Sequence, residues 1–200
     1  VFSTALIIQF VFASLLFLGL YFGAPSLLNS ISKNSIIAGL QGQFIGIRAY
    51  AFFPSCLFLI IQAYFLAKGK TWPVLFSAIV TALSNIILDY SLIFGNFGCP
   101  ELGVKGAALA STLSDVIGML SMLFLFKMDK ENRLFGLGFF NGKSTKNILK
   151  VSSPLMVQGS IALGTWTLFF MMIEQRGVFE LTVSQNIRSI YFLAFVPIWG

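Results

Sequence analysis

Long apolar segments separated by short polar stretches are the feature that most constrains this chain. Each is about 20 residues long, the length that an α-helix needs to cross a bilayer. Backbone polar groups inside a membrane must bond within their own segment, so we predict an all-α, multi-pass membrane protein with six transmembrane helices. The six segments cover residues 2–22, 47–67, 72–95, 102–126 and 151–173, and a last one that begins near residue 181.

The composition supports the same class and excludes others. Charged residues make up only 10% of the chain, against roughly 25% in soluble domains. The chain has no histidine, which excludes histidine-based metal sites and Ser-His or Cys-His catalysis. Neither Cys56 nor Cys99 has an obvious activating partner. We therefore expect neither an enzyme nor a bound cofactor.

Basic residues lie mainly between the apolar segments and are distributed unequally over the two sides of the membrane. Eight of them fall on the side of residues 127–150 and four on the other side. Because Lys and Arg accumulate in cytoplasmic loops, we expect 127–150 to be cytoplasmic. Topology then accounts for the net charge of +6, so the expected partner is the lipid bilayer and not nucleic acid.

An acidic residue, Asp89, interrupts the apolar run 72–95. An ionisable group is costly to keep inside a membrane, so its first interpretation is functional. Asn85 lies four residues earlier on the same helix face, where its amide can hold the acid or help it to coordinate a cation. On the next segment, Ser111 counts to nearly the same depth as Asp89. We predict that Asp89, Asn85 and Ser111 bind a cation or a proton.

Four further polar residues are candidates for the lining of a cavity. Asp115 lies one turn beyond Ser111 and is either a second proton site or the partner of a basic group from a helix outside this chain. Tyr50 counts to about the level of the predicted site, and Gln62 lies farther inward. Arg188 lies inside the last segment and either lines the cavity or pairs with an acid.

Other residues suggest structural roles. Arg48 is most simply an interfacial residue whose side chain reaches the membrane surface, and Pro54 is expected to kink the segment 47–67. Asp129 and Glu131 are expected on a solvated face of the connector. A face of small residues predicts close helix contact, and it consists of Gly103, Gly106, Ala107 and Ala110.

The third and fourth segments carry a distinctive series of residues. It consists of Asn85-Ile86-Ile87-Leu88-Asp89, Ile93-Phe94-Gly95, Pro100, Leu102-Gly103-Val104, Gly106-Ala107-Ala108 and Ala110-Ser111. This pattern resembles the multidrug and toxic compound extrusion (MATE) family of cation-coupled efflux transporters. The resemblance implies that the family's cation-site asparagine and aspartate correspond to Asn85 and Asp89, where sodium is one candidate ligand, and that a threonine corresponds to Ser111.

The resemblance implies a twelve-helix transporter with two lobes, of which this chain holds about the third to the eighth helix. Residues 1–126 would supply four helices of the first lobe, 127–150 the cytoplasmic inter-lobe connector, and 151–200 the first two helices of the second lobe. Both chain ends fall inside apolar segments, so we expect the chain to be truncated at each end.

The implied activity is secondary active multidrug efflux. The full-length protein is expected to be monomeric in the cell membrane and to export small organic, often cationic, compounds in exchange for sodium ions or protons. Two alternatives stay open. A lipid-linked oligosaccharide flippase of the same superfamily would favour a cavity with several basic residues. A non-transporting membrane scaffold subunit would hold Asp89 in a fixed salt bridge.

Overall fold

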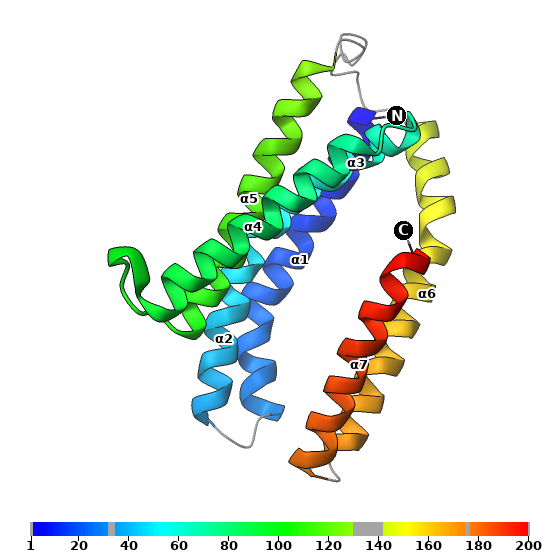
Figure 1. Cartoon of the computed structure of the whole chain (residues 1–200). Helices are drawn as coiled ribbons and strands as arrows, with labels where there is room; N and C mark the ends of the chain where they lie inside the picture. The colour runs from blue at the N-terminus through cyan, green and yellow to red at the C-terminus, as the bar shows by residue number, and fades with distance from the viewer. Residues whose placement is uncertain (1, 32–34, 130–141, 175–176, 200) are drawn as a thin grey trace. The chain divides into compact units, whose positions relative to one another are not determined.

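The all-α fold class is confirmed by a computed structural model, which describes residues 2–31, 35–129, 142–174 and 177–199 (Figure 1). Within these ranges the secondary structure is helical and contains no strand. The helices are α1 (Phe2–Ile31), α2 (Ser35–Ala49), α3 (Phe52–Ala67), α4 (Trp72–Phe94), the 3₁₀ helix η1 (Asn96–Gly98), α5 (Val104–Met128), α6 (Gly142–Glu174) and α7 (Val178–Trp199).

The chain divides into two compact units, residues 1–145 and 146–200. The first contains α1 to α5, and the second contains α7 and most of α6. Helix α6 begins at Gly142, so the last nine residues of the expected connector 127–150 are helical. The assignment of the two lobes and their connector stays a prediction.

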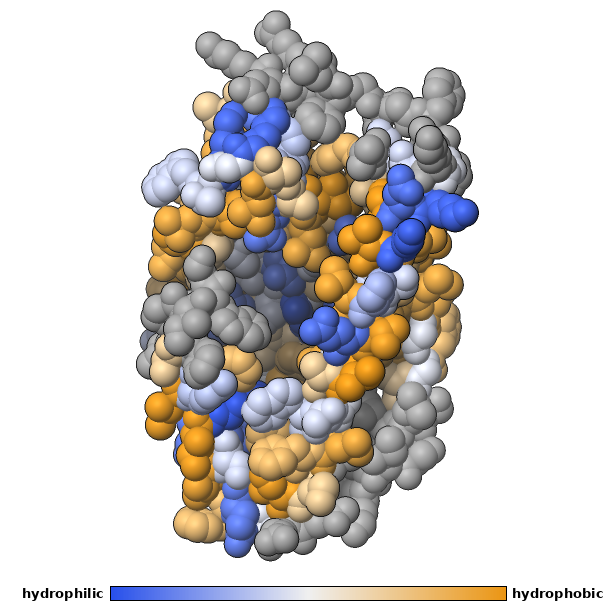
Figure 2. All heavy atoms as spheres, turned by 90° about the vertical axis from the view of Figure 1, so that its right-hand side faces the viewer, coloured by the Kyte–Doolittle hydropathy of each residue, from blue (hydrophilic) through white to orange (hydrophobic). Residues whose placement is uncertain are grey.

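Apolar helices long enough to cross a bilayer make this a membrane protein. In the described residues they are Phe2–Ala24, Trp72–Phe94 and Val104–Met128, with a fourth if α2 and α3 together form one broken span. Many of their large apolar side chains are exposed, among them Phe10, Leu83 and Phe124. The face drawn in Figure 2 likewise carries orange, hydrophobic residues, with blue ones among them. The fifth and sixth expected spans fall on α6 and α7, whose side chains are only partly described, and they stay predictions.

The first helix is longer than the sequence suggested. We expected apolar segments over 2–22 and 47–67, but α1 continues to Ile31 and α2 already begins at Ser35. Hydrophobicity did not indicate where these helices end. Gln, Leu and Ala, which occur between the two segments, favour a helix whether or not they face lipid.

The bend in the second expected span lies one turn before the predicted position. Helix α2 ends at Ala49 and α3 begins at Phe52, with an angle of 46° between the two. Pro54 itself lies in the first turn of α3, where its missing N–H needs no partner. A proline ring clashes with the carbonyl four residues earlier, which here belongs to Tyr50, and this explains why the chain bends at that residue.

Helices α4 and α5 pack closely because small residues lie between them. A Cβ atom added to Gly106 would overlap the backbone carbonyl of Leu92, and one added to Gly118 would overlap the hydroxyl of Thr81. Gly106 and Ala110 of the predicted small face are buried, whereas Gly103 precedes the helix. The buried face continues beyond the predicted one through Ala108, Ser114, Gly118 and Met122.

Charged groups join the end of α5 to the turn between α3 and α4. The Asp129 carboxylate accepts hydrogen bonds from the Lys70 ammonium at 3.0 Å and from the Tyr64 hydroxyl at 3.0 Å. Its side chain is only 10% exposed, so the expectation of a solvated Asp129 was wrong. Glu131 lies outside the described residues. These contacts place the turn 68–71 and the start of the connector at the same end of the first unit.

Gly106→Ala should destabilise the protein, because the added methyl group would force the backbones of α4 and α5 apart. We expect the free energy of unfolding of the full-length protein in detergent to fall by about 1–3 kcal/mol. Gly46→Ala is the matched control, because its Cβ would meet no atom within 4 Å. Equal thermal stability of the two variants would contradict this packing.

Candidate functional site

A polar cavity of about 450 Å³ lies in the first unit, where α3, α4 and α5 meet the end of α2. Two of the three residues predicted to bind a cation, Asn85 and Ser111, are in its wall. The lining consists of Arg48, Phe58, Ala78, Thr81, Ala82, Asn85, Ser111, Ser114 and Asp115.

Asn85 and Ser111 face each other across the contact between α4 and α5. The Asn85 amide nitrogen donates a hydrogen bond to the Ser111 hydroxyl at 3.4 Å. This hydrogen bond uses the amide nitrogen of Asn85. The side-chain oxygen of Asn85 can therefore accept a bond from a cation or a proton donor. The depth estimate from the sequence matched Ser111 with Asp89, whereas the contact in the structure is with Asn85, one turn earlier on α4. The function of these residues stays a prediction.

Asp89 follows Asn85 by one helical turn on α4 but is not in the lining of this cavity. It is half-buried, and its Oδ1 atom is buried without a hydrogen-bond partner among the described residues. An unsatisfied carboxylate oxygen inside a membrane is costly, and a proton or a bound cation would remove that cost. The described residues contain no group of three or more Asp, Glu or Cys side chains that could hold a metal.

Asp115 pairs with Arg48, so its basic partner lies on a helix of this chain, whereas a role as a proton site stays a prediction. The Arg48 Nη1 atom lies 2.7 Å from the Asp115 Oδ2 atom. The interfacial assignment of Arg48 was wrong, because its side chain turns inward to this carboxylate from the last turn of α2. A sequence shows no such pairing, since the two residues lie 67 positions apart.

The other three candidates do not line the polar cavity. Tyr50 lies at the break between α2 and α3 and packs against Phe17 and Tyr21 of α1, with ring centroids 5.1 and 6.1 Å away. Gln62 is half-buried on α3. Arg188 belongs to the second unit, where its guanidinium lies over the ring of Phe170 at 5.0 Å. Its expected place in a cavity between lobes stays a prediction.

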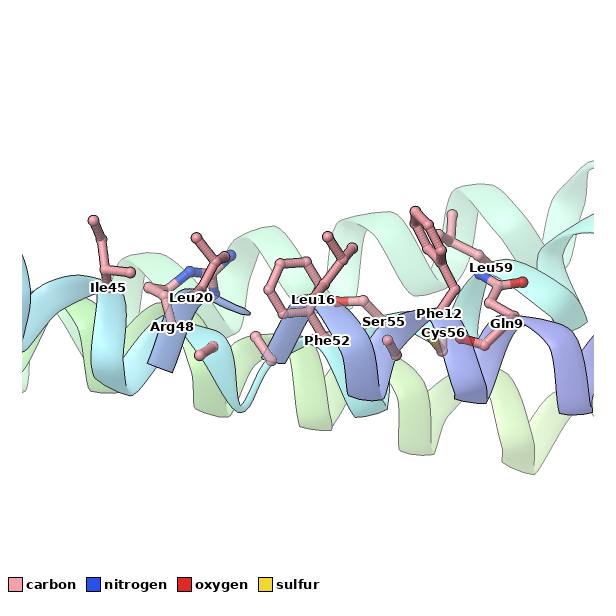
Figure 3. A pocket seen from close by; sticks show the side chains of 13 residues that line it. Gln9, Phe12, Leu16, Leu20, Ile45, Arg48, Phe52, Ser55, Cys56 and Leu59 are labelled. Carbon is pink, nitrogen blue, oxygen red and sulfur yellow. Dashed lines mark hydrogen bonds between the residues drawn. The ribbon is translucent and has the colours of Figure 1, made fainter. Parts of the chain in front are cut away.

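Arg48 also lines a second cavity, which the sequence did not indicate. This cavity has a volume of about 590 Å³, lies between α1, α2 and α3, and is largely apolar. In Figure 3, Arg48, Ile45 and Leu20 lie at one end of the row of lining side chains, and Gln9 and Leu59 lie at the other. Only tertiary packing shows it, because three helices contribute to its wall.

Thr81 of the polar cavity, by contrast, could have been found from the sequence, since it lies four residues before Asn85 on the same helix face.

Known proteins similar to this chain are multidrug resistance proteins. The probable multidrug resistance protein NorM of Rhizobium meliloti (strain 1021) is 38% identical over 92 residues, which cover 46% of this chain and 20% of that protein. NorM of Thermotoga maritima is 35% identical over 127 residues, 61% of this chain and 27% of that protein. NorM of Bacillus subtilis (strain 168) is 25% identical over 139 residues, 68% of this chain and 31% of that protein.

The chain therefore spans between 20% and 31% of the length of these relatives. None of their names describes an enzyme, in agreement with the sequence analysis. No protein-family profile matches the chain. No solved structure matches it either.

Neutralising Asp89 on α4 and Asp115 on α5 should have different effects on stability. Asp115→Asn leaves the Arg48 guanidinium unpaired, and we expect a loss of about 1–3 kcal/mol in the free energy of unfolding. Asp89→Asn removes a charge whose Oδ1 atom has no partner, so stability should stay the same or rise. Thermal unfolding of the two full-length variants in one detergent tests this contrast, and an equal loss in both would contradict it.

Proposed function

Because this chain belongs to the MATE family, we propose that it is part of a secondary active multidrug efflux antiporter. The transporter would export small organic, often cationic, compounds in exchange for sodium ions or protons. The observation that supports this proposal best is the buried, unpartnered Oδ1 atom of Asp89, one turn from the Asn85–Ser111 contact. A carboxylate oxygen without a hydrogen-bond partner is suited to bind and release a cation or a proton.

In this proposal Asp89 provides the charge, and Asn85 and Ser111 provide neutral oxygen atoms. A cation or proton at Asp89 would satisfy the orphaned oxygen and favour the arrangement of α4 and α5 in which the three residues face one another. Loss of that ligand would favour a different packing of the lobe. An ion gradient can drive substrate movement in this way when the ion and the drug favour opposite states.

The two alternatives receive less support from the described residues. A scaffold subunit would hold Asp89 in a fixed salt bridge, whereas no ion pair to Asp89 occurs within the described part of the chain. A flippase for lipid-linked oligosaccharides would favour a cavity with several basic residues. The polar cavity has a single basic residue in its lining, Arg48, and Asp115 neutralises it.

We also propose a location and a topology. The full-length protein would be a monomer in the cell membrane, with the connector 127–150 in the cytoplasm. The unequal distribution of basic residues supports this orientation. The Lys70–Asp129 contact also supports it, because it brings the basic turn 68–71 next to the start of the connector, as expected if both lie on one side of the membrane.

Asp89→Asn should abolish ion-driven drug efflux by the full-length protein, because it keeps the side-chain volume but fixes the site in a neutral state. Asn85→Ala and Ser111→Ala should weaken coupling less, since each removes a neutral hydrogen bond worth about 0.5–1.5 kcal/mol. The measurement is drug efflux from proteoliposomes under an imposed sodium or proton gradient. Ser111→Thr keeps the hydroxyl and is the matched control. Wild-type rates in Asp89→Asn would rule out its role in coupling.

The topology can be tested with single cysteines in a full-length variant that lacks Cys56 and Cys99. Asn147→Cys lies at an exposed position in the connector and should react with an impermeant thiol reagent only after cells are permeabilised. Glu101→Cys, exposed at the opposite end of α4, is the matched control and should react in intact cells. Labelling of both positions without permeabilisation would overturn the orientation.

A further inference from the structure

Arg48 lies where three structural features meet. It is in the last turn of α2, directly before the break of 46° that separates α2 from α3. It lines both the polar cavity of Asn85 and the apolar cavity of Figure 3. Its guanidinium binds Asp115, which stands four residues after Ser111 on α5. A single ion pair therefore connects a break in one span to the helix that carries part of the predicted cation site.

The backbone around Arg48 is suited to movement. The carbonyl of Arg48 accepts a hydrogen bond from Ala51 N–H at 3.0 Å, and the carbonyl of Ile47 accepts one from Tyr50 N–H at 3.2 Å. These bonds join residues three positions apart and replace the regular four-residue pattern of an α-helix. Such short irregular turns often mark hinges. The ion pair thus holds a side chain at the hinge itself.

The ion pair is accessible to a competing ion. The Arg48 and Asp115 side chains are 35% and 26% exposed, and both line the polar cavity. Among the described residues, no other charged side chain is in the lining of this cavity. Arginine does not lose its proton in proteins, so the carboxylate of Asp115 is the member of the pair at which a proton or a cation can bind. A bound cation or proton and Arg48 would compete for the same carboxylate.

We propose that the Arg48–Asp115 ion pair is a cation-sensitive latch. In the absence of a competing cation, Arg48 acts as a built-in counter-charge for Asp115 and holds the break between α2 and α3 against α5. A cation or proton that occupies Asp115 releases Arg48 and allows α2 to move at the break. The latch rests on the proposed function for the identity of the cation, a sodium ion or a proton, and it makes Arg48 a positioning residue.

The test measures the distance between α2 and α5 in the full-length protein. Spin labels would be attached at Leu40→Cys on α2 and Leu113→Cys on α5, two exposed positions, after replacement of Cys56 and Cys99 by serine. Distances would be recorded by pulsed electron paramagnetic resonance with sodium or choline at constant ionic strength, and at several pH values with choline alone. We expect sodium or acid to produce a second distance population in the otherwise unmodified protein.

The double variant Arg48→Gln/Asp115→Asn is the central comparison. It removes both charges together, so it should keep the stability that Asp115→Asn alone loses. A latch predicts that its distance distribution no longer responds to sodium or to acid. The same response with and without the ion pair would overturn the proposal, and so would the absence of any response in the protein with the intact pair.

Arg48→Lys provides a second test that does not depend on the double variant being folded. Lysine keeps the charge but lacks the planar, multiple donors of the guanidinium, so the pair with Asp115 should be weaker. The cation concentration at the midpoint of the distance change should then fall several-fold, and an unchanged midpoint would count against the latch. Asp89→Asn separates this proposal from the coupling role of Asp89, because it should abolish efflux and still show the distance change.

Discussion

Polar groups inside a bilayer have no water to bond, and the arrangement of the first unit follows from this constraint. Several hydroxyl groups meet it locally, as Thr81, Ser91 and Thr112 do by donating to the carbonyl four residues earlier at 2.7–2.8 Å. The Arg48–Asp115 pair meets it across helices. Against this background the orphaned Oδ1 atom of Asp89 is an exception, and exceptions of this kind indicate a ligand or a task.

Close packing of α4 and α5 is what allows these groups to meet. Gly106 and Gly118 lie against Leu92 and Thr81 with no room for a side chain, so the two backbones approach closely. Asn85 can then reach Ser111. The small-residue face therefore brings both the two backbones and the Asn85–Ser111 contact together, and a substitution that separates the helices would also separate these two side chains.

Charged residues were the least predictable part of the sequence. Arg48, Asp115 and Asp129 were each given more than one interpretation or a wrong one, because a charge in a sequence does not reveal its partner. In the structure Arg48 and Asp115 neutralise each other, and Asp129 joins Lys70 and Tyr64 at the end of the first unit. These contacts link residues 59 to 67 positions apart, so no local pattern could have indicated them.

The sequence by itself determined the membrane class and the four apolar segments of the first unit. It also singled out Asn85 and Ser111, although it matched Ser111 in depth to Asp89 and not to Asn85. Hydrophobic length and helical spacing are local properties, and a sequence shows them directly. Tertiary structure alone decided that the chain breaks at Tyr50, that Arg48 turns inward to Asp115, and that an apolar cavity forms between α1, α2 and α3. Each of these depends on which helices become neighbours, and that choice is made by packing over the whole unit.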